Sequence, residues 1–370
     1  MQFFRGLTIR KKQSSSSASA STERRKKEQN YYLQNGSAVL EEFLALCDGN
    51  CRIPIRYFTA TEIENAIKHS ENKLEQYSQV GIVTGSLDNR LVLAGFNRSC
   101  QLNIYRDIAI TAQMSHLKNV LRLVGCCLEF EEPVMVYEYV DAVTLNDLLY
   151  EKGDYHKTRE SLSWGKRLRI ANEVASAIVF LHTGFTTPII HRDIKPHKVI
   201  IDRNSGVAKI VDFSLSISLP PGELEVQDGI LCGTFWYLDP EYASLGIVTQ
   251  KTDVYSFGVL LLQLLTGNKS LDSMQSNIEK GNAMDRVDST TYPNPSIMVE
   301  HYIKERDAID ISDPLLEQHN IEIRQQLEDY LDLVKRCTSS KGEDRPYMIH
   351  VARELCRIEN CFRALTIGQN

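Results

Sequence analysis

The stretch of sequence that most restricts the fold of this chain is His191-Arg192-Asp193-Ile194-Lys195-Pro196-His197-Lys198, with Asp212-Phe213-Ser214 after it. Two short apolar runs, 199–201 and 208–211, lie between these motifs and flank a turn-forming Asn-Ser-Gly sequence. Apolar runs on either side of such a turn predict a β-hairpin. The chain therefore has to fold so that this hairpin connects two loops that each carry a carboxylate.

These motifs resemble the catalytic loop and the metal-binding turn of protein kinases, which read H-R-D-x-x-x-x-N and D-F-G. The run His191-Arg192-Asp193 and Asp212 match, but Lys198 stands at the Asn position and Ser214 at the Gly position. The resemblance implies that Asp193 would accept a substrate proton and that Asp212 would hold Mg²⁺. Because a lysine replaces one metal ligand, we expect a degenerate metal site at Asp212 and Lys198, a vestigial Asp193 and no cofactor.

The nucleotide-binding motifs are degenerate too. Kinases carry G-x-G-x-x-G-x-V and then V-A-I-K, whose Lys grips the phosphates. Only one glycine of the first motif remains, and Gly95 replaces the lysine. Leu93 stands where the family has Ala against the adenine ring, so we expect Leu93 and Val83 to fill the adenine space from inside the protein. The predicted, degenerate nucleotide site consists of Gly81, Val83, Leu93, Gly95 and Tyr137.

Other matching residues are expected to have structural roles. Asp107 replaces the helix Glu that pairs with the missing lysine, so both halves of that ion pair are changed. His191 and Arg192 are expected to brace the catalytic loop, and Asp253 to bind its backbone. A later Arg345 is expected to pair with Glu241.

The segment between Asp212 and Glu241 resembles a kinase activation segment. Trp236 replaces a glycine that lines the substrate groove in the family, which argues against ordinary substrate docking. Exposed aromatic residues are frequent anchors in protein interfaces. We therefore expect Phe235 and Trp236 to bind a partner, with packing of Trp236 against the protein as the alternative.

The first 70 residues lie outside this pattern. Residues 1–28 are rich in Ser, Lys and Arg and predict a disordered basic tail. Apolar spacing predicts a helix from near Ser37 and a second one over 60–68, capped by Thr59 or Thr61. The runs N-G-S, C-D-G-N and I-P-I-R-Y-F-T in this region resemble the N-terminal extension of plant wall-associated-kinase-like pseudokinases of the cytoplasm.

The expected fold is therefore a two-lobe, protein-kinase-like α+β fold. Its predicted parts are a basic tail, a helical extension, a small lobe, a large lobe with a mobile insertion over 268–295, and a C-terminal tail: residues 1–28, 29–70, 71–140, 141–362 and 363–370.

The plant resemblance implies a catalytically inactive adaptor in innate immunity. Its expected partners are an NLR immune receptor, bound through leucine-rich repeats, and an effector-modified receptor-like cytoplasmic kinase. The expected location is the cytoplasm, with the basic tail as a candidate contact to anionic lipid at the inner plasma membrane. No nucleic-acid partner is expected. The alternative is a weak or unconventional Ser/Thr kinase that uses Asp193 and Asp212.

Overall fold

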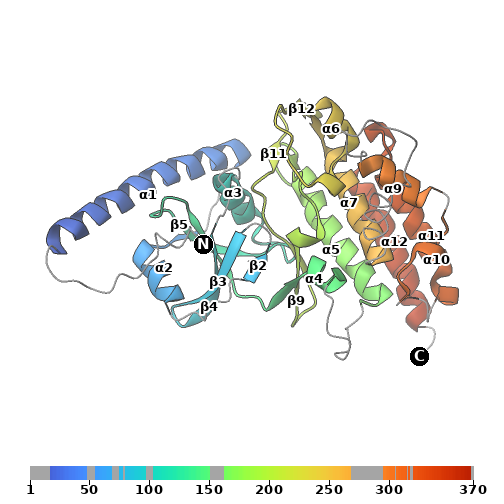
Figure 1. The fold of residues 1–370 in the computed structure, drawn as a ribbon, viewed down its shortest axis with the longest axis horizontal. Coiled ribbons are helices and arrows are strands. Elements are labelled where there is room, and N and C mark those ends of the chain that lie inside the picture. The colour runs from blue at the N-terminus through green and yellow to red at the C-terminus, as the bar shows by residue number, and fades with distance from the viewer. Residues whose placement is uncertain are drawn as a thin grey trace, which may run out of the picture.

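The structure, a computed structural model, consists of two lobes that lie side by side (Figure 1). It describes residues 17–47, 55–68, 75–77, 80–96, 103–150, 162–267, 295–304, 306–314, 316 and 320–367. Of the predicted insertion over 268–295, residues 268–294 lie outside the described residues, as do the first 16 residues of the chain, and Pro295 begins a helix. The predicted division into a β-rich small lobe and a helical large lobe is confirmed.

The small lobe is built on a six-stranded sheet with the order β1-β5-β6-β4-β3-β2. The strands are β1 (Arg56–Tyr57), β2 (Glu75–Tyr77), β3 (Val80–Leu87), β4 (Arg90–Phe96), β5 (Leu123–Cys127) and β6 (Val134–Glu138). The turn between β3 and β4 is Asp88-Asn89, where both residues have positive φ. Asn and Asp tolerate that left-handed conformation, which two-residue hairpin turns require.

Helices cover both faces of this sheet. One face packs on α2 (Ala60–Ile67), whose N-cap is Thr59, one of the two predicted caps, in a capping box with Glu62. The other face packs on α3 (Ile104–Met114), which belongs to the main hydrophobic core. Because both faces are covered, alternate side chains of a central strand enter two different apolar clusters, as Leu93 and Ala94 of β4 do.

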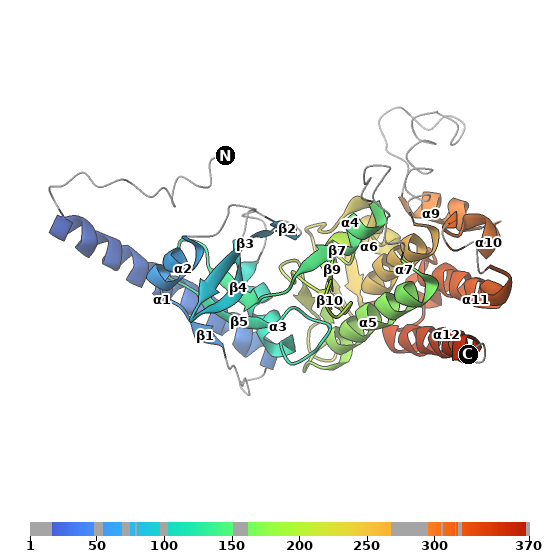
Figure 2. The ribbon, with the colours of Figure 1, turned by 90° about the horizontal axis from the view of Figure 1, so that it is seen from below.

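A long helix, α1 (Ser17–Cys47), lies against α3 on the outer side of the small lobe (Figures 1 and 2). The prediction of disorder was wrong for residues 17–28, and so was a helix start near Ser37. Ser, Ala, Glu, Arg and Lys form helices readily when something holds the helix in place. Here Arg24 pairs with Glu28 and, at 2.9 Å, with Glu64 of α2, while Asn35 donates to the carbonyl of Leu128.

The large lobe is helical around α7 (Gln250–Thr266), in which every residue from Thr252 to Thr266 is buried. α5 (Trp164–Thr183) packs against α12 (Met348–Ile367), and α11 (Asn320–Cys337) packs against α7. The predicted tail from residue 363 is wrong up to Ile367, because α12 continues to that residue. The remaining helical elements are α4 (Leu145–Tyr150), η2 (Pro196–Lys198), η3 (Phe235–Tyr237), α6 (Pro240–Leu245), α9 (Pro295–Ile303), α10 (Ala308–Ile311) and η5 (Gly342–Asp344).

Small sheets position the loops between the lobes. β7 (Ala142–Thr144), β9 (Val199–Asp202) and β10 (Ala208–Ile210) form one sheet, in which β9 and β10 are the predicted hairpin. β8 (Ile189–Ile190) pairs with β11 (Ile217–Ser218), and β12 (Glu225–Gln227) pairs with β13 (Ile247–Thr249). Among the described residues, no helix combines the length and apolar character needed to cross a bilayer.

Candidate functional site

The loop from His191 to Lys198 follows β8, and its backbone is held in place by a buried carboxylate of α7. Asp253 accepts hydrogen bonds from the backbone N–H groups of His191 (2.8 Å) and Arg192 (2.9 Å), and its Oδ2 lies 2.9 Å from His182 Nε2. Arg192 has a φ of 68°, a conformation that costs energy for a residue with a side chain. The predicted role of Asp253 as a support for this backbone is therefore confirmed.

His191 connects this loop to the Asp212-Phe213-Ser214 turn. Its ring lies 5.4 Å from the ring of Phe213, and both side chains are fully buried. Burial lowers the pKa of His191, which favours a neutral imidazole. The pair is a packing contact between the loop and the turn, in agreement with the bracing role expected for His191.

Asp193 is buried and surrounded by donors from its own chain. Its Oδ1 accepts a hydrogen bond from Thr234 Oγ1 at 2.6 Å, and its Oδ2 lies 2.9 Å from Lys195 Nζ and 3.5 Å from Lys198 Nζ. Lys195 also donates to Thr234 at 2.5 Å. Lys195 and Thr234 were missed by the sequence reasoning, although Lys195 lies only two residues after Asp193. Both carboxylate oxygens of Asp193 are thus engaged in intramolecular contacts.

Lys198 provides a positive charge where the family pattern has a metal ligand. Its ammonium forms an ion pair with Asp212 Oδ2 and lies 3.5 Å from Asp193 Oδ2. The Lys198 side chain is only 2% exposed. Lys198 therefore contacts both carboxylates, because a lysine reaches farther than an asparagine and neutralises buried negative charge.

Asp212 is held by further contacts of the turn. It has a φ of 69°, and its Oδ1 accepts hydrogen bonds from Ser214 Oγ at 2.5 Å and from Ser214 N at 3.2 Å. Ser214 at the Gly position therefore ties the carboxylate to its own turn. Among the described residues, no group of three or more His, Cys, Asp or Glu side chains is arranged to hold a metal ion.

Asp107 of α3 lies against the same turn. Its Oδ1 accepts hydrogen bonds from Phe213 N at 3.0 Å and from Thr111 Oγ1 at 2.9 Å, whereas its buried Oδ2 has no hydrogen-bond partner in the described part of the chain. Burial and the nearby charge of Asp212 raise the pKa of Asp107 to about 7. Asp107 therefore binds a backbone N–H of the turn, whereas the corresponding residue of the family pairs with a lysine.

We expect the stability of the protein to depend on pH through Asp107. Its pKa is near 3.8 when unfolded and about 7 when folded, so the folded state keeps a proton that the unfolded chain loses. This contribution is fully present below about pH 4 and is lost as the pH rises towards 7. Asp107→Asn should therefore gain stability relative to the wild type, by about 3 kcal/mol, between pH 5 and pH 8.

Urea unfolding at the two pH values measures this difference. The matched control is Asp310→Asn, because Asp310 is an exposed aspartate at the start of a helix. A constant difference between Asp107→Asn and the wild type across the pH range would contradict the assignment.

In the small lobe, the residues of the predicted nucleotide site are packed among apolar side chains. Leu93 is 1% exposed and pairs across the sheet with Tyr137 of β6, while Gly95 pairs with Ile82 of β3. Leu93, Ile82 and Tyr137 belong to the same hydrophobic core. Burial raises the pKa of Tyr137, whose hydroxyl lies 3.2 Å from Met135 Sδ.

The expected partnership of Leu93 with Val83 is wrong by one residue. Val83 lies opposite Ala94, and the side chain of Ala94 packs in the cluster under α2. Since directly paired residues share a face and neighbouring residues alternate, Val83 and Leu93 point to opposite faces of the sheet. Ile82 is the residue of β3 that shares the core with Leu93. Gly81 pairs with Phe96, and the glycine-loop residues before β3 are described only over Glu75–Tyr77.

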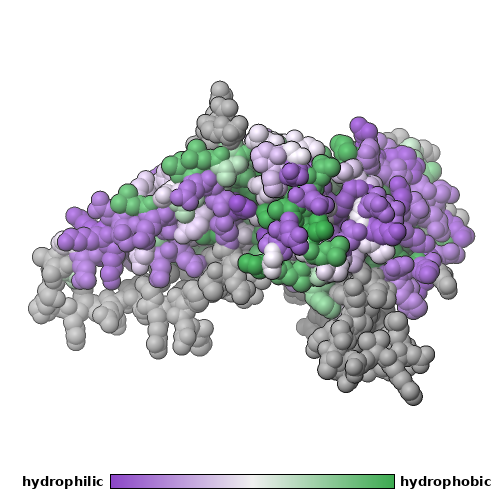
Figure 3. Space-filling model, turned by 90° about the horizontal axis from the view of Figure 1, so that it is seen from above, coloured by the Kyte–Doolittle hydropathy of each residue, from purple (hydrophilic) through white to green (hydrophobic). Residues whose placement is uncertain are grey.

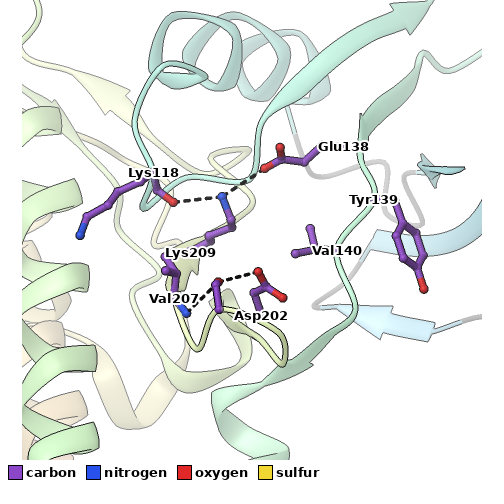
Figure 4. Close-up of a pocket in the computed structure, with 8 residues that line it drawn as sticks. Lys118, Glu138, Tyr139, Val140, Asp202, Val207 and Lys209 are labelled. Atoms are coloured by element: carbon purple, nitrogen blue, oxygen red, sulfur yellow. Dashed lines mark hydrogen bonds and ion pairs between the residues drawn. The ribbon is translucent and has the colours of Figure 1, made fainter. Parts of the chain in front are cut away.

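A shallow cavity of about 220 Å³ lies elsewhere between the lobes (Figure 4). It contains none of the predicted site residues, and its lining includes Glu138, Val140 and Lys209. Lys209 Nζ donates to the carbonyl of Lys118 at 3.0 Å and lies 3.1 Å from Glu138 Oε1. These bonds link β10 of the large lobe to the small lobe, so the cavity is a by-product of an interlobe contact.

The aromatic pair of the activation segment is divided between surface and core. Phe235 is 46% exposed, whereas Trp236 is partly buried and packs against the main core. Their ring centroids are 5.5 Å apart in an edge-to-face arrangement. Of the two predicted anchors, Phe235 is the exposed one, and Trp236 contacts it from the side of the core.

The expected ion pair between Arg345 and Glu241 is wrong. Arg345 is buried and pairs with Asp239 at 2.8 Å, and it also donates to the carbonyls of Lys251 and Ser339. Asp239 is the N-cap of α6, and its side chain turns inward, whereas Glu241 lies in the first helical turn. Arg345 still has the expected structural role, with a different carboxylate.

Comparison with known proteins agrees with this geometry. The protein kinase domain family matches residues 94–356. The serine/threonine-protein kinase ZRK1 of Arabidopsis thaliana is 35% identical over 89% of this chain and 92% of its own length. The non-functional pseudokinase ZED1 of the same plant is 34% identical over 88% of this chain and 96% of its own length. Wall-associated receptor kinase 2 of that plant is 34% identical over 88% of this chain but 42% of its own length.

These relatives include proteins named as kinases and as pseudokinases, so likeness alone does not decide activity. The two lobes, the loop and turn around Asp193 and Asp212, and the extent of the match to the kinase domain agree with one another. The chain belongs to the protein kinase family.

Proposed function

We propose that this protein is a catalytically inactive pseudokinase that acts as an adaptor in plant immunity. The observation that carries the inactivity is the Lys198 ammonium, which lies between Asp212 and Asp193 where a kinase holds metal. Phosphoryl transfer depends on positioning and on metal charge, and Gly95 at the phosphate-gripping position removes a further part of that machinery. Asp193, already bonded to Thr234 and Lys195, then serves the fold.

Transfer of radiolabelled phosphate by the purified protein tests this proposal. We expect the wild type to show the same background as Asp193→Asn, both on itself and on a generic protein substrate. Transfer that Asp193→Asn abolishes would support the alternative, a weak kinase that uses Asp193 and Asp212.

We further expect that Mg·ATP does not stabilise the protein. A ligand that binds only the folded state stabilises it by RT ln(1 + [L]/Kd), so weak binding leaves the melting temperature unchanged. The buried Leu93 and the ammonium of Lys198 occupy the regions that the base and the metal need. A thermal-shift titration measures this, and a rise of several degrees at about 1 mM nucleotide would contradict the expectation.

The adaptor role rests on the exposed surface of the activation segment and α6. Exposed apolar side chains gather there, namely Leu224, Ile230, Leu231, Phe235 and Leu245. Figure 3 looks down on the side that carries β12 and α6, and apolar surface lies near the middle of that view. An exposed apolar group with a polar surround is typical of a protein-binding surface. We assign it to the proposed receptor-like cytoplasmic kinase.

Phe235→Ala is expected to weaken binding of that partner by more than about 1 kcal/mol, because a half-exposed aromatic side chain loses its contact area. The partner is first identified by co-purification from plant tissue with mass spectrometry, and its affinity is then measured by titration. Leu91→Ala is the control, since Leu91 is an exposed apolar residue of the small lobe. Equal affinities of Phe235→Ala and the wild type would refute this surface.

Two further parts of the proposal rest on the family resemblance. The second partner is an NLR immune receptor that binds through its leucine-rich repeats, and the location is the cytoplasm. The exposed Arg25, Lys26 and Lys27 of α1 support a proposed contact with anionic lipid of the inner plasma membrane.

A further inference from the structure

We propose that Asp228 is a built-in substitute for an activation-segment phosphate, and that it holds the segment in place without any modification. This role of Asp228 does not require the proposed partners. The group that needs an anion is the guanidinium of Arg192, whose side chain is 9% exposed. A buried cation of this kind is costly unless an anion and hydrogen-bond acceptors surround it.

Asp228 supplies that anion. Its Oδ2 forms an ion pair with Arg192 Nη1, and Arg192 Nε donates to the carbonyl of Leu215 at 2.6 Å. Arg192 Nη1 also lies 3.4 Å from the hydroxyl of Tyr242. The guanidinium thus connects the catalytic loop to the start and the middle of the activation segment and to α6, which follows the segment.

Asp228 also organises the backbone around itself. Its Oδ1 accepts a hydrogen bond from Ile230 N at 3.1 Å, and its own N–H donates to the carbonyl of Gly246 at 2.9 Å. The hydroxyl of Tyr242 donates to the carbonyl of Ile230 and accepts from Cys232 N, both at 2.9 Å. The backbone that carries the exposed Ile230 and Leu231 is therefore held by hydrogen bonds on both sides of these two residues.

Phosphorylation cannot supply the anion from this part of the segment. Residues 219–233 contain no Ser, Thr or Tyr. Of the flanking hydroxyl groups, Ser214 and Ser216 are buried, Thr234 is bonded to Asp193 and Lys195, and Ser218 is partly exposed in β11, where it pairs with Ile189. Kinase activation loops are ordered by new pairs between arginine and a phosphorylated residue. Here the charge is encoded as an aspartate, so the order is permanent.

Hydrogen–deuterium exchange of the purified chain tests the proposal at the amides of Ile230 and Cys232. Asp228→Asn keeps the shape of the side chain and an acceptor for Ile230 N, but it removes the charge. We expect exchange at both amides to rise by about tenfold or more, because charge-assisted bonds are the strong ones in such a local opening. Glu225→Gln removes an exposed charge from the same segment and should leave exchange unchanged.

Asp228→phosphoserine, compared with Asp228→Ser, separates the role of the anion from that of shape. Phosphoserine provides a negative charge and several acceptor oxygens. We expect phosphoserine to restore the protection of both amides from exchange. The unphosphorylated serine should leave these amides as weakly protected as Asp228→Asn does. Protection that is unchanged in Asp228→Asn, or equal looseness with serine and phosphoserine, would overturn the proposal. Neither result depends on whether the protein binds a partner or transfers phosphate.

Discussion

Replacing Lys198 with methionine is expected to lower the free energy of unfolding by about 3 to 5 kcal/mol. Methionine keeps much of the apolar stem but removes the ammonium that pairs with Asp212 and lies 3.5 Å from Asp193. Asp212 is buried, and the pKa of Asp107 is already raised by burial and by the nearby charge of Asp212. The variant leaves these carboxylates crowded without a counterion. Urea unfolding monitored by circular dichroism measures the change.

A double variant separates the charge effect from lost packing. If the damage comes from an uncompensated carboxylate, Lys198→Met combined with Asp212→Asn should be more stable than Lys198→Met alone. The matched lysine control is Lys341→Met, because Lys341 is 67% exposed. Equal stability of the single and double variants would show that Lys198 contributes no charge compensation.

Lys198→Asn adds a test of the metal position. It restores the residue type that the kinase pattern has there. We expect Mg²⁺ to raise the melting temperature of this variant and to leave the wild type unchanged, because only the variant offers the cation a place beside Asp212. An equal response of both proteins to Mg²⁺ would contradict this reading.

The second large effect is expected at Leu93. Leu93→Ala should cost about 2 to 5 kcal/mol of stability, because its side chain is fully packed and the removed carbons leave a cavity. Leu93 is 1% exposed, whereas Leu91 on the same strand is 53% exposed. Leu91→Ala is therefore the control, with an expected change within about 0.5 kcal/mol.

The same variant tests whether Leu93 alone prevents nucleotide binding. We expect Mg·ATP to leave the melting temperature of Leu93→Ala unchanged in a thermal-shift titration. The reason is that Gly95 cannot bind the phosphates and Lys198 cannot bind the metal ion. A loss of stability as small as that of Leu91→Ala would show that Leu93 does not fill the space. A nucleotide response in Leu93→Ala would show that filling the adenine space is the main obstacle.

Much of the site was predictable because the relevant contacts are short-range or belong to strong motifs. Lys198 and Asp212 lie at the two ends of a short hairpin, so the motif alone brings their side chains together. Thr59 caps α2 through a bond within four residues. Asp253 falls in a strongly apolar helix, where a lone carboxylate needs nearby backbone donors.

Other features needed the tertiary structure. A shift of one residue in a strand reverses its face, so only the pairing of β3 with β4 showed that Ile82, not Val83, accompanies Leu93. Arg345 could reach either of two nearby carboxylates, and the orientation of α6 selected Asp239. In the sequence, Asp228 is one of several acidic residues in its segment, and only the fold places it against Arg192.

By itself, therefore, the sequence determined the kinase-like fold, the loss of the phosphate-binding lysine at Gly95 and the presence of Lys198 at a metal-ligand position. Each of these depends on residue identity at a motif position. The tertiary structure decided which carboxylate meets which cation and which strand residues enter the core. It also decided that residues 17–28 are helical, through the pairing of Arg24 with Glu64. Those outcomes depend on the distances and faces that long-range packing sets, and no local pattern of residues encodes them.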